Sequence, residues 1–233
     1  GTSIQYPDPI GSAFDELKRT FYDDYSWRSL YNNPLSASYD ASWNSYLLAA
    51  SDINAPYAQA NITTSALKGM VTGTRVKALG SSTYLYSISF YDNKGRVIQM
   101  QSTNISGGTD IATTQYSWAG QPLIMISKTE KAGSGQQISV IVTQNSYDDL
   151  GRLVKVEKRQ SNSLVSLGSM SAYKTILENE YDKLGQLSKK KLGKKVDGIT
   201  PLEILQYDYN IRGWMLGMNR DYLGLPGQSG TVK

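Results

Sequence analysis

Three aspartates at equivalent positions of a repeated pattern are the first candidates for chemistry in this chain. Asp92, Asp148 and Asp182 each follow a tyrosine and precede a glycine by three residues. Asp149 stands beside Asp148, and carboxylates grouped in this way could bind calcium. Calcium, however, requires six to eight oxygen ligands, and the sequence has no Asp-x-Asp-x-Asp loop. An aspartate just before a glycine also caps a tight turn by accepting backbone N–H groups. We therefore expect turn capping and no metal site.

The composition removes most catalytic chemistry. The 233 residues include no histidine and no cysteine. This excludes Ser-His-Asp triads, histidine bases, thiol nucleophiles, disulfides and nearly every ordinary zinc site. The segment Gly133-Ser134-Gly135 lacks the rest of a phosphate-binding loop. Carboxylate pairs for glycoside hydrolysis cannot be assigned by residue type alone; the candidates are Asp23, Asp24, Glu178, Glu180, Glu203 and Asp208. We expect no enzyme activity and no cofactor.

A run of lysines is the sharpest feature of the charge pattern, and it consists of Lys189, Lys190, Lys191, Lys194 and Lys195. With a formal net charge of +4, nucleic-acid binding is one hypothesis. In a strand, however, Lys189 and Lys191 point away from Lys190, so the run does not make one face. Lysines on an exposed strand also discourage edge-to-edge pairing. We therefore expect no nucleic-acid partner.

The pattern Tyr-Asp-x-x-Gly-Arg/Gln-apolar recurs along the chain. Its members are Tyr91, Asp92, Gly95 and Arg96; Tyr116 and Gly120; Tyr147, Asp148, Gly151 and Arg152; Tyr181, Asp182 and Gly185; and Tyr209 and Gly213. The successive tyrosines are 25, 31, 34 and 28 residues apart by subtraction. A constant centre with arms of variable length is the signature of a repeat architecture.

Each copy predicts a β-hairpin. Around Tyr147, residues 138–144 lead in and residues 153–158 lead out; both arms are rich in β-branched residues, and the outgoing arm alternates apolar with charged. Gly151 supplies the positive φ that closes a type I turn with a bulge. A single hairpin is marginal in water, but stacked copies bury a common face. The fold class expected is all-β, a meandering antiparallel sheet of five hairpin units over residues 67–233.

The first part of the chain, residues 1–66, predicts a loop-rich region that packs on the sheet. It carries many aromatic residues, which a disordered linker would rarely contain. Residues 42–50 favour a turn or two of helix, and for residues 12–19 a short helix and an edge strand remain open. Tyr22-Asp23 repeats the start of the pattern, but no glycine follows three residues later, so we take it as a relic or a chance match.

The tyrosine content is biased, with 17 tyrosines against 3 phenylalanines. Tyrosine suits a half-exposed sheet face, where its ring packs and its hydroxyl stays in water. No stretch approaches the roughly 18 consecutive apolar residues that indicate a membrane span. We therefore expect no membrane insertion, and the aromatic faces are candidates for ligand contacts.

The Tyr-Asp-x-x-Gly-Arg-Leu core resembles the YD repeats of RHS proteins, bacterial relatives of the teneurin shell. The resemblance covers residues 84–214, a little over half of the chain. Three copies are close to the family pattern, although Gln186 replaces the arginine in one of them. In the looser copies, Ser117 and Asn210 replace the aspartate. The irregular spacing resembles the versions found in Bacteroidetes-like surface proteins.

The resemblance implies a structural role at the cell surface or outside the cell. In that family the repeats form a β-sheet strip that spirals into a hollow cocoon. The cocoon commonly holds a C-terminal toxic domain that is released after self-cleavage by a conserved core region. Neither the core region nor a toxin is visible in this sequence. The resemblance therefore implies a segment of a secreted toxin shell whose partners are further repeats and a C-terminal effector of its own polypeptide.

One alternative function remains open. Exposed tyrosine faces and variable loops could bind carbohydrate, that is glycans, or a partner protein at the surface. The purely structural interpretation is that the tyrosines pack against the sheet and that the repeat residues are a scaffold and not catalysts.

Overall fold

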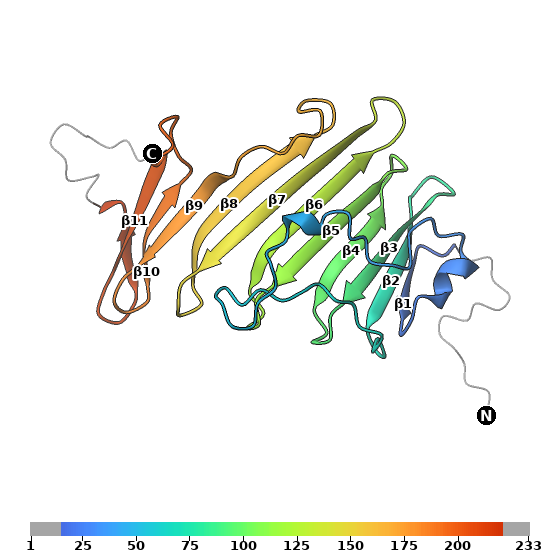
Figure 1. Ribbon diagram of the computed structural model, residues 1–233, viewed down its shortest axis with the longest axis horizontal. Helices are drawn as coiled ribbons and strands as arrows, with labels where there is room; N and C mark the ends of the chain where they lie inside the picture. The colour runs from blue at the N-terminus through green and yellow to red at the C-terminus, as the bar shows by residue number, and fades with distance from the viewer. Residues whose placement is uncertain (1–14, 221–233) are drawn as a thin grey trace. The chain divides into compact units, whose positions relative to one another are not determined.

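The computed structural model describes residues 15–220, and the all-β expectation is confirmed there. Twelve strands form one sheet whose strand order is the chain order, from β1 to β12 (Figure 1). Neighbouring strands run antiparallel, for example β7 with β8 and β10 with β11. The expectations for Ser12 and for the segments beyond residue 220 lie outside the described residues.

From β2 onward the strands follow one another with short connections, whereas residues 23–70 separate β1 from β2. They are β1 (Lys18–Tyr22), β2 (Val71–Lys77), β3 (Tyr84–Tyr91), β4 (Val97–Thr103), β5 (Thr109–Tyr116), β6 (Pro122–Lys131), β7 (Gln137–Tyr147), β8 (Leu153–Asn162), β9 (Lys174–Tyr181), β10 (Leu187–Leu192), β11 (Glu203–Tyr209) and β12 (Met215–Met218). Two short 3-10 helices, η1 (Ser26–Leu30) and η2 (Asn44–Tyr46), lie between β1 and β2 in the sequence. Residues 106–108, 132–135 and 193–198 lie in the connections between neighbouring strands.

The beginning of the chain resolves one of the open alternatives. From Lys18 the chain forms an edge strand, β1, that pairs antiparallel with β2. The helix expected at residues 42–50 is reduced to the single turn η2. The physical reason is that the backbone of Leu48 makes its hydrogen bonds to the side chain of Gln115 on β5, so a helix cannot continue there.

Contacts divide the chain into two compact units with interleaved segments. The first unit comprises residues 1–41, 62–112 and 129–136, and the second comprises residues 42–61, 113–128 and 137–233. Each unit therefore contains part of the segment between β1 and β2 together with hairpins of the sheet.

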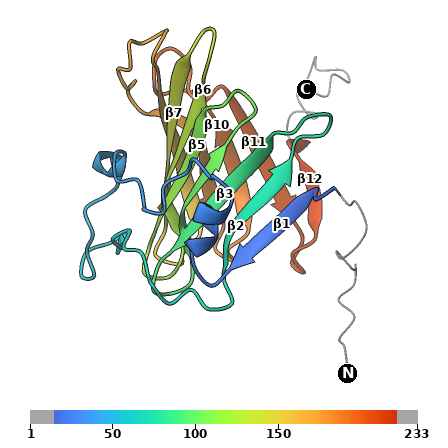
Figure 2. The same cartoon turned by 90° about the vertical axis from the view of Figure 1, so that its right-hand side faces the viewer.

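In the first unit, η1 lies over one face of β2 and β3 (Figure 2). Trp27 on η1 is buried, and its indole N–H donates to the hydroxyl of Thr72 over 3.2 Å. Phe21 stacks on the Trp27 ring at a centroid distance of 4.0 Å. A Cβ at position 73 would lie 2.2 Å from the Trp27 ring, so Gly73 permits this close approach. Ile88 lies opposite Gly73 in β3 and is buried.

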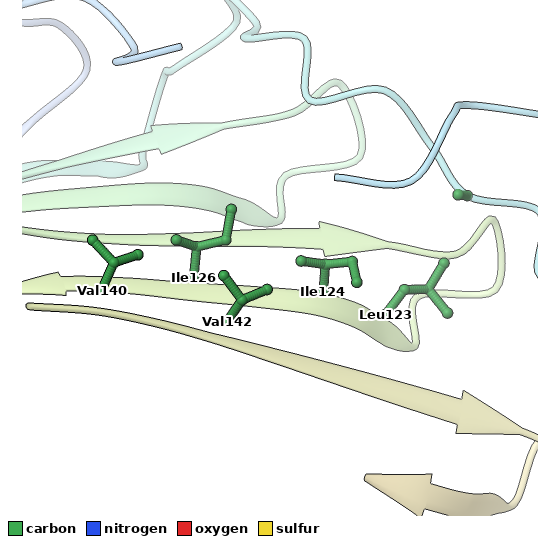
Figure 3. Close-up of a cluster of buried hydrophobic side chains, with 6 residues drawn as sticks. Leu123, Ile124, Ile126, Val140 and Val142 are labelled. Atoms are coloured by element: carbon green, nitrogen blue, oxygen red, sulfur yellow. The ribbon is translucent and has the colours of Figure 1, made fainter. Parts of the chain in front are cut away.

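In the second unit, the core is a cluster on β6 and β7. Ile124, Ile126, Val140 and Val142 are buried and lie together on neighbouring strands (Figure 3). Their spacing of two residues within each strand puts them on one face of the sheet. The cluster also includes Leu123 and Ala58, and the partly buried residues packed against it are Trp43, Tyr46, Leu47, Leu48, Ile138, Tyr147, Met170 and Tyr173. Trp43 and Tyr46, two of the aromatic residues in segment 42–61, thus pack against the sheet.

Candidate functional site: a row of tyrosine–aspartate turns

The aspartate of each close copy caps its own turn. Asp92 Oδ1 accepts the backbone N–H groups of Lys94 and Arg96, both at 2.9 Å. Its second oxygen accepts the Arg96 Nε at 2.7 Å. Asp148 does the same with Leu150 and Arg152, again with the arginine Nε at 2.7 Å. The carboxylates are thus occupied by their own turns, and the described residues contain no group of acidic side chains that could hold a metal ion.

The other copies reach the same geometry with different side chains. Asp182 Oδ1 accepts the N–H groups of Leu184 and Gln186. In the fifth copy, the amide oxygen of Asn210 accepts those of Arg212 and Trp214. In the second copy, the hydroxyl of Ser117 accepts the N–H of Gln121 at 3.1 Å. The looser copies therefore keep the cap and change only its charge.

The glycines close the turns as expected. The N–H of Gly95 donates to the carbonyl of Asp92, and the N–H of Asp92 donates to the carbonyl of Arg96. The strand register shifts between Phe90 and Tyr91, which is the predicted bulge. The same pair of backbone bonds recurs in the other four copies, and the φ angles of the closing glycines, 75° to 92°, favour glycine; they are Gly95, Gly120, Gly151, Gly185 and Gly213.

The tyrosine hydroxyls bind the sheet backbone and do not stay in water, which corrects the expectation. Tyr147 donates to the carbonyl of Pro122 over 3.2 Å, and Tyr181 donates to that of Leu153 over 2.8 Å. Each acceptor is the first residue of the preceding strand. Tyr91 with Val71 and Tyr209 with Leu187 repeat the arrangement at 2.7 and 3.1 Å. Burial raises the pKa of the Tyr91 and Tyr147 hydroxyls, so these groups remain protonated donors at neutral pH.

Two asparagines reinforce the tyrosine contacts, and the sequence reasoning missed them. Asn145 lies two residues before Tyr147, and its amide donates to the same Pro122 carbonyl at 2.9 Å. Asn179 likewise joins Tyr181 on the Leu153 carbonyl at 2.9 Å. The signal was present as Asn-x-Tyr-Asp in two close copies. It could have been found by extending the repeat two residues toward the N-terminus.

Consecutive turns also touch through the residue that follows each glycine. The amide nitrogen of Gln121 lies 2.9 Å from where a Cβ on Gly151 would stand. The guanidinium of Arg152 lies 3.3 Å from the equivalent point on Gly185, and it also sits over the Tyr181 ring, 4.4 Å from its centroid. The amide of Gln186 covers Gly213 in the same way at 2.8 Å. The Arg/Gln position of the second, third and fourth copies therefore covers the glycine of the following copy, whereas nothing lies within 4 Å of a Cβ added to Gly120.

The pair Tyr22-Asp23, expected to be a relic or a chance match, belongs to a sixth turn that is split. The N–H of Asp23 donates to the carbonyl of Met70, as that of Asp92 does to Arg96. Asp23 Oδ1 accepts the N–H of Gly69, whose φ is 79°. The terminal methyl of Met70 covers Gly95 at 3.3 Å. Residues 24–68 are thus inserted between the aspartate and the glycine of this turn.

Buried glutamines hold the inserted residues against the sheet. In the first unit, Gln99 on β4 pairs with both backbone groups of Asp40, at 2.8 Å to the N–H and 2.9 Å to the carbonyl. In the second unit, Gln115 on β5 pairs with both backbone groups of Leu48 and also donates to the carbonyl of Gln59 at 3.0 Å. A glutamine amide used in this way makes the two hydrogen bonds that the backbone of a neighbouring strand would make, because it offers one donor and one acceptor side by side.

Charge around the turns follows from these contacts. Burial of Asp92 opposes its ionisation, but hydrogen bonds from Arg96 and Lys94 outweigh burial and lower the pKa of that carboxyl. The Arg152 backbone N–H is the main cause that lowers the pKa of Asp148, and the Arg152 side chain adds to it. In the lysine run, both Lys189 and Lys191 pair with Glu180. The side-chain hydrogen bond from Lys191 lowers the pKa of Glu180.

A cavity of about 610 Å³ lies beside the longer connection between β8 and β9. Ser139 and Ile141 form part of its wall. The amide of Asn162, which also lines it, is engaged within the chain: it donates to Ser139 at 2.7 Å and accepts the N–H of Leu164 at 2.9 Å. The cavity wall is therefore held together by its own polar groups.

Comparison with known proteins yields one weak structural similarity and no matching family. No protein-family model matches the sequence, and no curated protein matches it. Among solved structures, the chain is similar to the Photorhabdus luminescens Tc holotoxin pore with the mutation TccC3-D651A, at 15% identity and a TM-score of 0.31. The match covers 64% of this chain and 8% of the other. At this TM-score the similarity carries no argument about function.

The part of the chain that the structure describes holds no helix long and apolar enough to cross a membrane. The residues singled out from the sequence do not converge on one pocket. The repeat-motif residues lie in separate turns, one per hairpin, and the turns of the second unit contact one another through the tyrosine and the Arg/Gln position. This arrangement fixes the hairpins of the second unit side by side.

Proposed function

We propose that this chain is a structural segment of an RHS-like β-shell that encloses or presents a C-terminal effector at the cell surface or outside the cell. The observation that carries the proposal is the interlocking of successive turns. The hairpins of the second, third and fourth copies each supply a cover for the glycine and a carbonyl for the tyrosine of the following copy. Such contacts extend a sheet by one unit at a time, which is what a wall requires.

The contacts of the repeat-motif residues support a scaffold role and not a catalytic one. The turn aspartates are occupied by backbone N–H groups and arginine side chains. The hydroxyl of Tyr181 is occupied by a backbone carbonyl. Since these groups already have partners in the folded chain, they stabilise the wall and leave the effector chemistry to another part of the polypeptide.

The alternative of a glycan- or protein-binding module rests on aromatic residues outside the turn hydroxyls. Tyr57 and Trp118 are exposed large aromatics of the second unit, and the Trp118 N–H donates to the carbonyl of Tyr57. An exposed aromatic pair of this kind can stack on a sugar ring. Trp118→Ala distinguishes the two functions, because it removes a stacking surface and leaves the turn hydrogen bonds intact.

The decisive experiment for enclosure is the mass of the native polypeptide in its source cell, detected with an antibody against this 25.7 kDa segment. A product far above that mass that protects its C-terminal part from added protease is the expected result. A native product of about the mass of this segment would contradict enclosure, since twelve strands would then constitute the whole sheet.

A further inference from the structure

Arg159 on β8 is a partly buried cation that has no acidic partner in the described part of the chain. Its Nε is covered by protein and makes no hydrogen bond, whereas its terminal nitrogens are not among the covered atoms. Glu157 lies two residues earlier on the same face of the strand, but it pairs with Lys155 over 2.8 Å. Removing part of a charged group from water without giving it a partner is costly. The unpaired guanidinium therefore indicates a site for an acceptor from outside the chain.

Two tyrosine rings hold the Arg159 guanidinium over the apolar core of the second unit. The guanidinium lies 4.8 Å from the ring centroid of Tyr46 and 4.5 Å from that of Tyr173. Both tyrosines pack against the buried cluster, and Val142 of that cluster is the register partner of Arg159 on β7. The rings restrict the orientation of the guanidinium, and the apolar surroundings strengthen its attraction for a negative charge.

The hydroxyls of these two tyrosines add hydrogen-bond donors near the charge. Neither Tyr46 nor Tyr173 uses its hydroxyl in a hydrogen bond within residues 15–220. The turn tyrosines Tyr147 and Tyr181 differ, because backbone carbonyls already occupy their hydroxyls. The surroundings of Arg159 therefore keep donors that the turns have already used.

The cavity of about 610 Å³ beside the connection between β8 and β9 adjoins this group. Ser161 is the next residue after Arg159 on the same face of β8, and it lines the cavity. Met170 lines the cavity too, and it packs against the buried cluster as the two tyrosines do. Most of the remaining lining is serine, asparagine or glutamine, and it includes no lysine or arginine. A polar cavity of this size can hold a small molecule, and its lining adds no second positive charge.

We propose that Arg159, Tyr46 and Tyr173 bind the carboxylate of a small hydroxycarboxylic acid whose hydroxyl groups occupy the cavity next to Ser161. A carboxylate is planar and carries one negative charge. It therefore matches a single guanidinium, which donates two parallel N–H bonds to it. The tyrosine hydroxyls donate to the same carboxylate, and the polar cavity lining exchanges hydrogen bonds with the hydroxyl groups of the ligand.

This site is separate from the exposed aromatic pair Tyr57 and Trp118, because recognition at Arg159 depends on charge. All of its residues belong to the second unit. The site does not depend on the shell function, so either can be rejected without the other.

The test is a titration followed by the NMR signal of the Arg159 Nε–H group in the whole 233-residue chain. Glucuronate is the probe, because it combines a carboxylate with several hydroxyl groups. Glucose has the hydroxyl groups without the carboxylate, acetate has the carboxylate without the hydroxyl groups, and inorganic phosphate is an oxyanion of different shape. Arg159→Lys identifies the signal and keeps the positive charge without the planar fork. Arg212→Lys is the matched control, since Arg212 also lies over an aromatic ring, that of Trp214, at 5.9 Å.

Glucuronate should shift the Arg159 signal along a saturable curve, and glucose, acetate and phosphate should each bind at least about tenfold more weakly. Arg159→Lys should weaken glucuronate binding about tenfold or more, because the bidentate contact is lost. Tyr173→Phe keeps the ring and removes the hydroxyl, so it should weaken binding about fivefold. Arg212→Lys should leave the affinity unchanged.

The absence of a saturable shift with glucuronate would overturn the site, as would equal binding by the wild-type and Arg159→Lys proteins. Glucose that binds as tightly as glucuronate would overturn the role of the charge. Acetate or phosphate that binds as tightly would overturn the assignment of a hydroxycarboxylic acid. If Arg159→Lys does not fold, Tyr173→Phe decides, because unchanged affinity in a variant with native thermal unfolding would reject the site.

Discussion

The amide nitrogen of Gln121 lies 2.9 Å from where a Cβ on Gly151 would stand, and it donates to the carbonyl of the same glycine over 3.1 Å. The contact joins two turns that are separated by 30 residues in sequence. It shows why the glycine position is constrained twice, once by its positive φ and once by the neighbouring turn.

Gly151→Ala separates these two constraints. Gly107 closes a turn of the same backbone pattern, with a φ of 85° and nothing within 4 Å of an added Cβ. Both alanine variants should lose about 1–2 kcal/mol from the left-handed backbone. Gly151→Ala should lose about 1 kcal/mol more, because Gln121 must leave its carbonyl. Urea unfolding measures both free energies.

The excess cost of Gly151→Ala should disappear when Gln121 is also changed to alanine, because no amide is then left to displace. Equal destabilisation by Gly151→Ala and Gly107→Ala in the wild-type background would show that the contact between turns has no energetic consequence.

Tyr181→Phe should destabilise the chain by about 1 kcal/mol, since it removes the hydrogen bond to the Leu153 carbonyl. Asn179→Ala should cost a similar amount through the same acceptor. The two changes share one carbonyl, so the double variant should cost more than the sum, as the last change leaves that carbonyl without either donor. A double-mutant cycle from chemical unfolding measures the coupling, and strict additivity would show that the pair does not act as a unit.

Asp92→Asn should reduce the free energy of unfolding by about 1–2 kcal/mol at pH 7. It should also reduce the further loss of stability that occurs at acid pH. Asparagine keeps the backbone cap, as Asn210 does in the fifth copy, but it loses the charged bond to Arg96. The pKa of Asp92 is lowered on folding. Its contribution is therefore present above the unfolded pKa of about 3.9 and is lost as pH falls through the lower folded value.

Thermal unfolding between pH 7 and pH 2 tests this prediction, with Asp149→Asn as a control of equal charge change at an exposed turn position. Wild type and Asp149→Asn should both lose stability steeply below about pH 4, and Asp92→Asn less so. Parallel curves for all three proteins would contradict the assignment.

Gln115→Leu should release the segment around Leu48. The substitution removes three hydrogen bonds and leaves the partly buried backbone groups of Leu48 without these partners. A cost of about 2–4 kcal/mol is expected. Amide exchange should accelerate at Leu48, and protease should cut within residues 42–61. Unchanged exchange at Leu48 would mean that packing of the aromatics, and not the glutamine, holds this segment.

The parts of the fold that could be predicted are those encoded locally. Tyr147, Asp148 and Gly151 lie within five residues of one another, and their types alone specify the cap, the positive φ and the bulge. Alternation in the flanking arms then specifies strands. The hairpins and most of their loops follow directly from such short-range patterns.

The parts that could not be predicted depend on contacts between distant residues. Gln99 and Asp40 are 59 positions apart, and a glutamine in a strand carries no mark of a buried backbone partner. The hydrogen bonds of the tyrosine hydroxyls to backbone carbonyls could not be predicted for the same reason. Tyr181 and its acceptor Leu153, for example, are 28 positions apart. The candidate scaffold could be named residue by residue, but the way its members interlock required the structure.

The split turn at Asp23 and Gly69 has a consequence for how such chains diverge. A long segment can be inserted between these two residues while the sheet keeps its register. The Asp23 N–H still donates to the Met70 carbonyl, as the Asp92 N–H donates to the Arg96 carbonyl. Tight turns are therefore the positions where this architecture tolerates new material, and a foreign domain grafted between Asp148 and Gly151 would use the same entry. Sequence searches that require a fixed interval between tyrosine-aspartate and glycine will overlook every repeat that has been opened in this way.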